Sequence, residues 1–311
     1  MKFSLSCCWN SHRHDDGYAM VRELVDLGFE YIELSHGVRI SLVPGILRAV
    51  DEGVVKISSV HNFCPLPTGI NFAAPNVYQP SAFHGQEHAL WYRNTLKTID
   101  FARRVGADLM VVHSGSVPFW WRHPEARLEI AASALSLEER AGNRAYEKLR
   151  TKELNRVRRK QRKYRAQLIA SLCSVLPAAK EKGVRMGIEN REGVTELPID
   201  SEMRGLLAEL GEPEWVGYWH DAGHAQLKER LGLFPHRQLL EDNSDRLFGF
   251  HLHDVSADER DHQPLGTGVI DWQMVRSYLR SEHIAVLELS PRLSPAEVIH
   301  SRNFASAQLI A

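Results

Sequence analysis

The sequence predicts a single (β/α)8 barrel, and three observations support this prediction. Short apolar runs alternate with stretches of helical period along the 311 residues, as is typical of parallel βαβ units. Eight such runs occur, each is followed by a helical pattern, and no linker-like segment divides them. Several of the runs end in His, Asp or Glu, and a barrel gathers the C-terminal ends of its strands at one mouth. A closed barrel therefore fits the pattern better than an open sheet, and we treat residues 1–311 as one domain.

The N-terminal half supplies four of the predicted strands. A helix is expected at residues 16–27 because Met20, Val21 and Leu24 fall on one face and Gly28 follows as a stop signal. The other predicted helices of this half are residues 42–52 and 86–105. The predicted strands are residues 1–9, 29–34, 54–60 and 109–112.

A helical extension is expected after the fourth strand, because residues 118–176 show no strand pattern. Its middle, residues 144–165, holds eleven Lys or Arg against two Glu. The apolar stripe there is only partial, so much of this helix should face water. Three interpretations stay open: a lengthened barrel helix or helical hairpin, a subunit contact of a homo-oligomer, and a patch for phosphate or nucleic acid.

The alternation resumes at Gly183, and here the strand ends become strongly polar. The four predicted strands run into Glu189, Asp221, His251 and Glu288. The predicted helices are residues 201–210, 235–243, 271–281 and a last one from residue 295.

Composition excludes several classes of protein. Charged residues are 25% and hydrophobic residues 43%, and the formal net charge of −1 gives no global attraction to nucleic acid or membrane. No apolar run approaches the roughly 18 residues that a membrane span needs. The four cysteines lack zinc-type or disulfide spacing, which favours reduced thiols in a cytoplasmic protein. Phosphate-loop, dinucleotide and nucleophile-elbow motifs are also missing from the sequence.

The polar ends of the last four strands predict a metal site. Glu189, Asp221, His251 and Glu288 come from strands that are neighbours in a barrel. Burying three carboxylates and an imidazole is costly unless a cation pairs with them. This ligand set suits Mn²⁺, Mg²⁺ or Co²⁺ and is compatible with Zn²⁺. The alternative is four independent hydrogen-bonded strand ends.

Two more histidines suggest a second metal site. His61 and His113 end the third and fourth strands, and Glu189 could bridge between them and the first ion. The nine histidines without a spacing argument, among them His36, are interpreted as surface or packing residues.

Three histidines are candidates for substrate binding. His224 follows Asp221 by three residues, one helical turn if the segment coils, and could act as a ligand, a substrate contact or a helix cap. His253 should face the same cavity as His251, as a substrate contact or a supporting residue. His262 lies on the loop after the seventh strand and could close over the mouth.

These motifs resemble the xylose-isomerase-like TIM barrel superfamily, which contains sugar isomerases and epimerases, inosose dehydratase and endonuclease IV. The resemblance covers nearly the whole chain except the basic helical segment. It is carried by Val60-His61 with Gly69-Ile70-Asn71, Val112-His113-Ser114-Gly115, Ile188-Glu189-Asn190, Asp221-Ala222-Gly223-His224, His251-Leu252-His253-Asp254 and Leu287-Glu288-Leu289-Ser290-Pro291.

The resemblance implies a metal-dependent isomerase, epimerase or dehydratase acting on a small sugar or polyol. It implies that Glu189, Asp221, His251 and Glu288 bind one divalent ion and that the two glutamates also move the proton. His224 would contact the substrate, and His253, Arg191 and His262 are further candidates for that role.

Endonuclease IV offers an alternative function, a zinc phosphodiesterase acting on DNA. The resemblance implies a first zinc on His61, His113 and Glu189. A third zinc there uses the residue matching His224 and an Asp-x-His motif, in which Arg260 here replaces the Asp, so the third site is doubtful. This departure from the motif counts against a nuclease, and a nucleic-acid partner is not expected. A further alternative is a non-catalytic barrel with a binding or assembly role.

Overall fold

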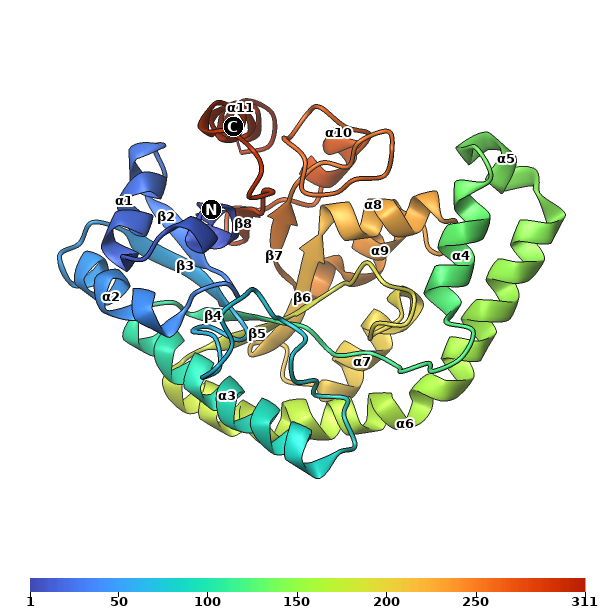
Figure 1. Ribbon diagram of the computed structural model, residues 1–311, viewed down its shortest axis with the longest axis horizontal. Helices are drawn as coiled ribbons and strands as arrows, with labels where there is room; N and C mark the ends of the chain where they lie inside the picture. Colours follow the sequence, from blue (N-terminus) through green and yellow to red (C-terminus); the bar gives the residue numbers. More distant parts are fainter. Residues whose placement is uncertain (311) are drawn as a thin grey trace.

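The computed structural model describes residues 1–310, and its eight parallel strands close into a barrel in sequence order (Figure 1). Each strand pairs with the next, and β1 pairs with β8. The strands are β1 Lys2–Ser6, β2 Tyr31–Leu34, β3 Lys56–His61, β4 Leu109–Val112, β5 Arg185–Glu189, β6 Val216–Asp221, β7 Leu247–Leu252 and β8 Ile284–Leu287. The predicted (β/α)8 fold is confirmed.

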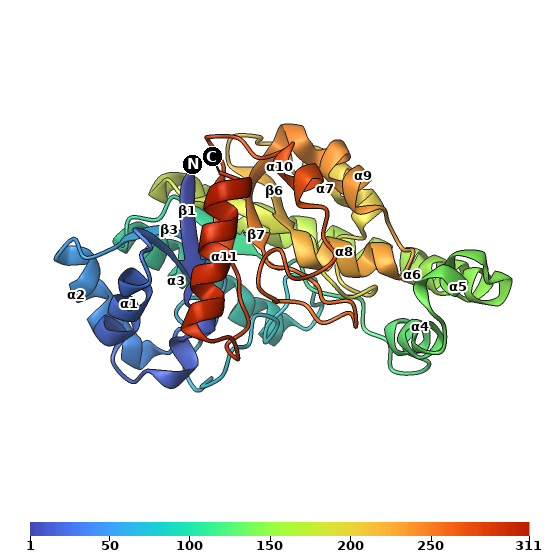
Figure 2. The same cartoon turned by 90° about the horizontal axis from the view of Figure 1, so that it is seen from above.

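Helices follow the strands and cover the outside of the barrel (Figures 1 and 2). The first helix forms as predicted, because Asp16 caps it by accepting the N–H groups of Tyr18 and Ala19 and because Met20 and Leu24 are buried. The helices are α1 Gly17–Asp26, α2 Val43–Asp51, α3 Gly85–Arg104, α4 Pro124–Ser133, α5 Leu137–Gly142, α6 Arg144–Lys182, α7 Met203–Leu210, α8 Ala222–Arg230, α9 His236–Asn243, α10 Trp272–Arg276 and α11 Pro295–Gln308.

The extension after β4 consists of α4, α5 and the first part of α6, and residues 118–176 contain no strand. Helix α6 is a single helix of 39 residues between an Asn143 N-cap and a Gly183 C-cap. Its N-terminal part projects beyond the barrel together with α4 and α5 (Figure 2). The side chain of Glu153 is fully buried and pairs with Arg127 of α4 and Arg156 of α6. Most of the remaining Lys and Arg side chains of residues 144–165 face solvent, as expected.

Two helical elements differ from the prediction. Residues 271–281 form only the five-residue α10, because the chain turns after Ser277 and the Arg280 N–H is taken by the His283 ring. Conversely, the segment directly after β6 is helical as α8, with Asp221 as its N-cap. Asp221 Oδ1 accepts the His224 N–H at 2.7 Å, so His224 does lie one helical turn beyond Asp221.

An apolar layer fills the barrel below its mouth. It consists of Leu109, Val111, Trp219, Ile284 and Val286. A Cβ on Gly249 would lie 2.4 Å from the Trp219 ring, so only glycine leaves room for the indole there. The Trp219 ring lies edge-on to His251, with 5.1 Å between ring centroids. The polar strand ends therefore lie directly above this apolar layer of the barrel interior.

Burial keeps the thiols inside the barrel protonated at neutral pH. All four cysteines are free, and burial raises the pKa of Cys7 to about 11 and the pKa of Cys64 well above its ordinary value. Among residues 1–310, no helix combines the length and apolar character required to cross a bilayer.

Candidate metal centre and active site

The ends of β5 to β8 bring Glu189, Asp221, His251 and Glu288 together. His251 Nδ1 lies 3.1 Å from Glu288 Oε2, 3.3 Å from Glu189 Oε1 and 3.7 Å from Asp221 Oδ2. The ligand atoms of the four residues lie within 4.8 Å of one another, and all four side chains are buried. Asp221 and His251 are direct neighbours in the register of β6 and β7. The strand ends therefore meet as the sequence predicts.

Charge at this cluster is unbalanced towards the negative. Burial alone would raise the pKa of Glu189, but Arg191 and His113 outweigh it and hold this pKa well below its usual range. Burial alone would lower the pKa of His251, but Glu288 and Glu33 raise it well above its ordinary value. The imidazolium of His251 thus lies among the carboxylates, and a divalent ion bound there would take over the neutralisation of their charge.

Glu33, which the sequence analysis did not select, supports His251 from the opposite side. It lies on β2, next to the last residue of the strand, and is fully buried. Its Oε2 lies 3.2 Å from His251 Nε2 and accepts a hydrogen bond from Ser59. A carboxylate on one imidazole nitrogen leaves the other nitrogen, Nδ1, facing the cluster. This carboxylate–histidine arrangement is typical of metal-binding histidines.

A second cluster shares Glu189 with the first. Glu189 Oε2 lies 2.9 Å from His113 Nε2 and 3.4 Å from His61 Nε2. The other ring nitrogens are engaged, that of His113 by Asn76 and that of His61 by the Asn62 carbonyl. Burial and Arg191 lower the pKa of His113 to about 3, so its imidazole is neutral and free to act as a ligand.

The geometry around Glu189 fits a bound cation. Its Oε2 is buried and has no hydrogen-bond partner, although two imidazole nitrogens lie within 3.4 Å. Contacts this short without hydrogen-bond geometry are expected where several donors point their lone pairs at one ion, roughly 2 Å from each. His, Glu and Asp donors of this kind suit a transition metal or Mn²⁺. Glu189 could therefore bridge two ions, as the sequence suggests.

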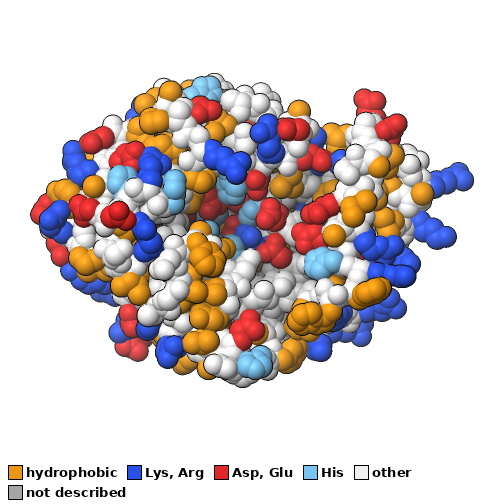
Figure 3. All heavy atoms as spheres, viewed as in Figure 1, with side chains coloured by type: hydrophobic (Ala, Val, Ile, Leu, Met, Phe, Trp, Pro, Cys, Tyr) orange, Lys and Arg blue, Asp and Glu red, His pale blue; other side chains and the backbone are white. Residues whose placement is uncertain are grey.

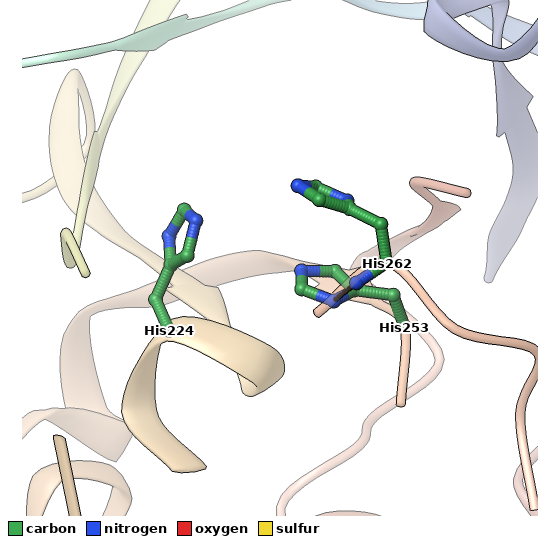
Figure 4. Close-up of side chains that lie close together, drawn as sticks. All are labelled: His224, His253 and His262. Atoms are coloured by element: carbon green, nitrogen blue, oxygen red, sulfur yellow. Dashed lines mark hydrogen bonds between the residues drawn. The ribbon is translucent and has the colours of Figure 1, made fainter. Parts of the chain in front are cut away.

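A third cluster surrounds His224 (Figure 4). His224 rises from the first turn of α8 towards His253 and His262, whose rings stack with 4.1 Å between centroids. The three histidines offer ligand atoms within 4.8 Å of one another, and His224 forms a similar group with Glu192 and Asp261. His262 N–H donates to His253 Nδ1, and His253 Nε2 lies 3.1 Å from Asp221 Oδ2. His253 thus holds Asp221.

Asn190, which the sequence analysis left without a role, fixes the geometry of Asp221. Its side-chain oxygen accepts the Asp221 N–H at 2.8 Å, and its side-chain nitrogen donates to the Asp221 carbonyl at 2.9 Å. Tyr218 O–H donates to the same side-chain oxygen. The Asn190 carbonyl lies 3.1 Å from His224 Nδ1, so this residue ties β5 to the start of α8.

Two cavities flank the centre at the mouth of the barrel. One, of about 340 Å³, is lined by Glu125, Leu128, Glu129, Glu192, Val194, Leu227, Leu231, Glu259 and Asp261. The other, of about 240 Å³, is lined by Cys8, Ser11, His12, Ser35, His36, Gly37, Arg39, Asn71, Phe72, Ala73 and Pro291. Figure 3 shows the hollowed mouth with acidic and histidine side chains inside it. One flank is therefore acidic and the other is not.

The family of the chain follows from its sequence match over most of its length. The family described as xylose isomerase-like TIM barrel matches residues 21–304. The chain belongs to this family. A comparison with curated proteins finds no match.

Solved structures similar to this family member include sugar epimerases. 3-Keto-D-glucoside 4-epimerase from E. coli in its apo form has a TM-score of 0.66 and 15% identity, and the match covers 99% of each chain. D-Allulose 3-epimerase from Methylomonas sp. in complex with D-allulose has a TM-score of 0.67 and 13% identity, with 99% of this chain and 97% of that chain covered. IolI protein with a binding zinc atom has a TM-score of 0.65 and 12% identity, with 100% and 98% covered. At identities this low, the structural similarity establishes the shared fold alone.

The predicted family membership is confirmed, and the structure gathers the predicted site residues around one mouth. It also brings in three residues that the sequence did not single out. Glu33 stands behind His251, Asp261 joins the group of His224, and the His36 ring lies edge-on to His61 with 4.8 Å between centroids. Glu33 precedes Leu34, the last residue of its strand, so the strand-end argument did not select it.

Proposed function

We propose that the protein is a divalent-metal-dependent isomerase or epimerase, or a dehydratase, that removes a proton next to a carbonyl of a sugar or polyol. The observation that supports this most is the convergence of Glu189, Asp221, His251 and Glu288 on one buried point at the barrel mouth. The structural similarity to sugar epimerases supports it further.

The four residues would hold the ion, and Glu189 and Glu288 would also transfer the proton. A divalent ion bound there would polarise the substrate carbonyl and stabilise the negative charge that develops on its oxygen. Glu189 has a pKa well below its usual range, so it is ionised at neutral pH, which is the protonation state that a base requires. Glu288 follows β8, whereas Glu189 ends β5. Glu288 would return the proton as the acid.

The remaining candidates orient the substrate or the catalytic groups. Arg191 Nη1 lies 3.3 Å from Glu189 Oε1, and Arg191 Nε lies 3.2 Å from Glu196 Oε1. Arg191 would therefore hold Glu189 in position and keep it ionised. His224 and His262 face the mouth and would contact substrate hydroxyls. The hydrogen bonds of His253 favour a positioning role for that residue rather than the substrate contact predicted from the sequence.

The experiment is a screen of ketoses and inososes with Mn²⁺ in deuterated water, followed by NMR detection of deuterium next to the carbonyl. Glu189→Gln and Glu288→Gln should each lower the exchange rate at least about 100-fold, because a positioned acid or base contributes that much or more. Glu214→Gln, an exposed carboxylate before β6 at the other end of the barrel, is the matched control and should keep most of the activity. Full activity in Glu189→Gln, or no exchange with any substrate, would contradict the proposal.

A phosphodiesterase of the endonuclease IV kind is the second candidate, and the two additional clusters favour it. His61, His113 and Glu189 form one, and Asp261 provides the third cluster with a carboxylate although Arg260 replaces the motif residue. This function requires two or three ions per chain, whereas the isomerase requires one. Elemental analysis of the purified protein and cleavage of an abasic duplex separate the two functions.

A further inference from the structure

We infer that the cavity beside Arg39 binds an anionic group, a phosphate or a carboxylate, at the end of the substrate that lies away from the reacting carbonyl. The inference rests on the proposed function, because it names the substrate class of the same mouth. A cavity of about 240 Å³ is smaller than a complete ligand site and suits one end of a ligand.

The lining of this cavity is rich in hydrogen-bond donors. Its polar residues are Ser11, His12, Ser35, His36, Arg39 and Asn71, and none of the residues that line it is acidic. Hydroxyl, amide, imidazole and guanidinium groups together are the usual partners of a phosphate or carboxylate in proteins. The cavity therefore has the chemistry of an anion site.

Arg39 has unused capacity to bind such an anion. Its Nε is buried and has no hydrogen-bond partner. One terminal nitrogen donates to the His14 carbonyl, and the ion pair with Asp15, at 3.2 Å, involves a carboxylate that is fully exposed to solvent. An exposed partner neutralises a guanidinium weakly, because water screens the pair. The charge of Arg39 is thus available to a ligand.

The cavity adjoins both donor clusters of the metal centre. On one side His36 packs against His61 of the second cluster, with 4.8 Å between ring centroids. On the other side Cys8 Sγ donates to the carbonyl of Leu289, the residue after Glu288. A substrate that presents its carbonyl between Glu189 and Glu288 can therefore extend its far end into this cavity.

The opposite flank excludes the same group. Five carboxylates line the 340 Å³ cavity, namely Glu125, Glu129, Glu192, Glu259 and Asp261, and only Glu259 among them pairs with arginines, Arg140 and Arg230. Like charges at these distances repel an anion. An anionic substrate is left with one orientation, in which its charged end lies beside Arg39.

The test uses the full chain, both chelator-treated and loaded with Mn²⁺, with inorganic phosphate as the probe in calorimetry. Asn71→Asp adds a negative charge to the cavity without a change of size, and Asn71 is exposed, so the fold should tolerate it. Asn71→Asp and Arg39→Gln should each weaken phosphate binding about tenfold or more, because each removes or opposes a charged contact. Asn303→Asp, at an exposed position of α11 outside both cavities and outside the basic segment of α6, carries the same charge change and should bind phosphate normally.

Sugars then identify the source of the charge. D-Fructose, its 6-phosphate and the corresponding 6-carboxylate are compared, and Asn71→Asp should weaken the charged ligands while the free sugar is unchanged. Preference for the phosphate or for the carboxylate in the wild type assigns the natural group. Phosphate that binds only to the Mn²⁺-loaded protein, or that binds Asn71→Asp within twofold of the wild type, would overturn the inference.

The two proposals fail in distinguishable ways. Phosphate binding that depends on Arg39, with no deuterium exchange in any sugar, would leave the cavity assignment intact and remove the isomerase. Deuterium exchange in neutral sugars, with phosphate binding unaffected by Asn71→Asp, would leave the isomerase intact and remove the anion site.

Discussion

The two flanks of the barrel mouth are built alike but carry opposite chemistry. Segments after β8, β1, β2 and β3 place Arg39, histidines and hydroxyls around one cavity, whereas helix α4 and the loops after β5 and β7 place five carboxylates around the other. The metal-binding candidates lie between them at the strand ends. In the proposed function, the strand ends would determine which reaction the site performs, and the segments after them would determine which way a charged substrate lies.

The carboxylates of the acidic flank repel one another, and the other flank has no such repulsion between carboxylates. Burial and repulsion by Glu196 and Glu129 raise the pKa of Glu125, which shows that these carboxylates oppose one another. Such a field attracts cations to the mouth and repels anions from that side. In the proposed function the acidic flank would thus help to load the ion, and the other flank would receive the charged end of the substrate.

The largest effect is expected from pH, through the centre that both flanks share. Because neighbouring carboxylates raise the pKa of His251, Mn²⁺ must displace a proton from this imidazole. Mn²⁺ affinity should therefore fall about tenfold for each pH unit below the raised pKa. Calorimetry in buffers of different ionisation enthalpy should detect about one proton released per ion.

In the metal-free protein, the contribution of His251 to folding stability falls as the pH rises, whereas the Mn²⁺ affinity should increase with pH. The pKa of His251 is raised in the folded state, so its contribution to stability is complete below its ordinary value of 6.5 and is lost as the pH rises through the raised value. The stabilisation by Mn²⁺ should consequently grow with pH in thermal unfolding. A pH-independent affinity, with no proton released, would show that His251 is not a ligand.

A smaller effect is expected from Glu33→Gln, which breaks the link between the flanks, since Glu33 on β2 contacts His251 on β7. Loss of the carboxylate behind the imidazole should weaken Mn²⁺ binding about 10- to 100-fold, the usual effect of losing such a partner. Glu30→Gln, an exposed carboxylate just before the same strand, is the control and should bind normally. Equal affinities of the two variants would exclude this supporting role.

The site residues at the strand ends could be predicted from the sequence. Alternation places every second strand residue inside the barrel, so Glu189, Asp221 and His251 could be assigned to one mouth from their positions alone. The same rule applies to Glu33, but its strand, Tyr31–Leu34, continues into Ser35 and His36 without a sharp end. That carboxylate is identifiable only once His251 is seen to contact it.

Loop geometry was not readable from the sequence. Motif spacing along the chain counts against a third zinc site, because Arg260 stands at the position of the motif Asp. In the structure the adjacent Asp261, next to the turn at His262 with its φ of 51°, joins the group of His224. Likewise, Asn71 and Arg39 belong to loops after different strands and meet only through the fold. Cavity walls depend on contacts between distant segments, which spacing does not encode.

The smallest effect is expected from neutralising the acidic flank itself. The double variant Glu125→Gln with Glu129→Gln should strengthen phosphate binding about two- to threefold at low salt, because it removes repulsion across the mouth, and screening at about 0.5 M salt should abolish the gain. Glu214→Gln with Glu282→Gln makes the same charge change before β6 and β8, at the other end of the barrel, and should have no effect. A gain that persists in high salt would mean that phosphate contacts the acidic flank directly, and the assignment of the two flanks would then have to be reversed.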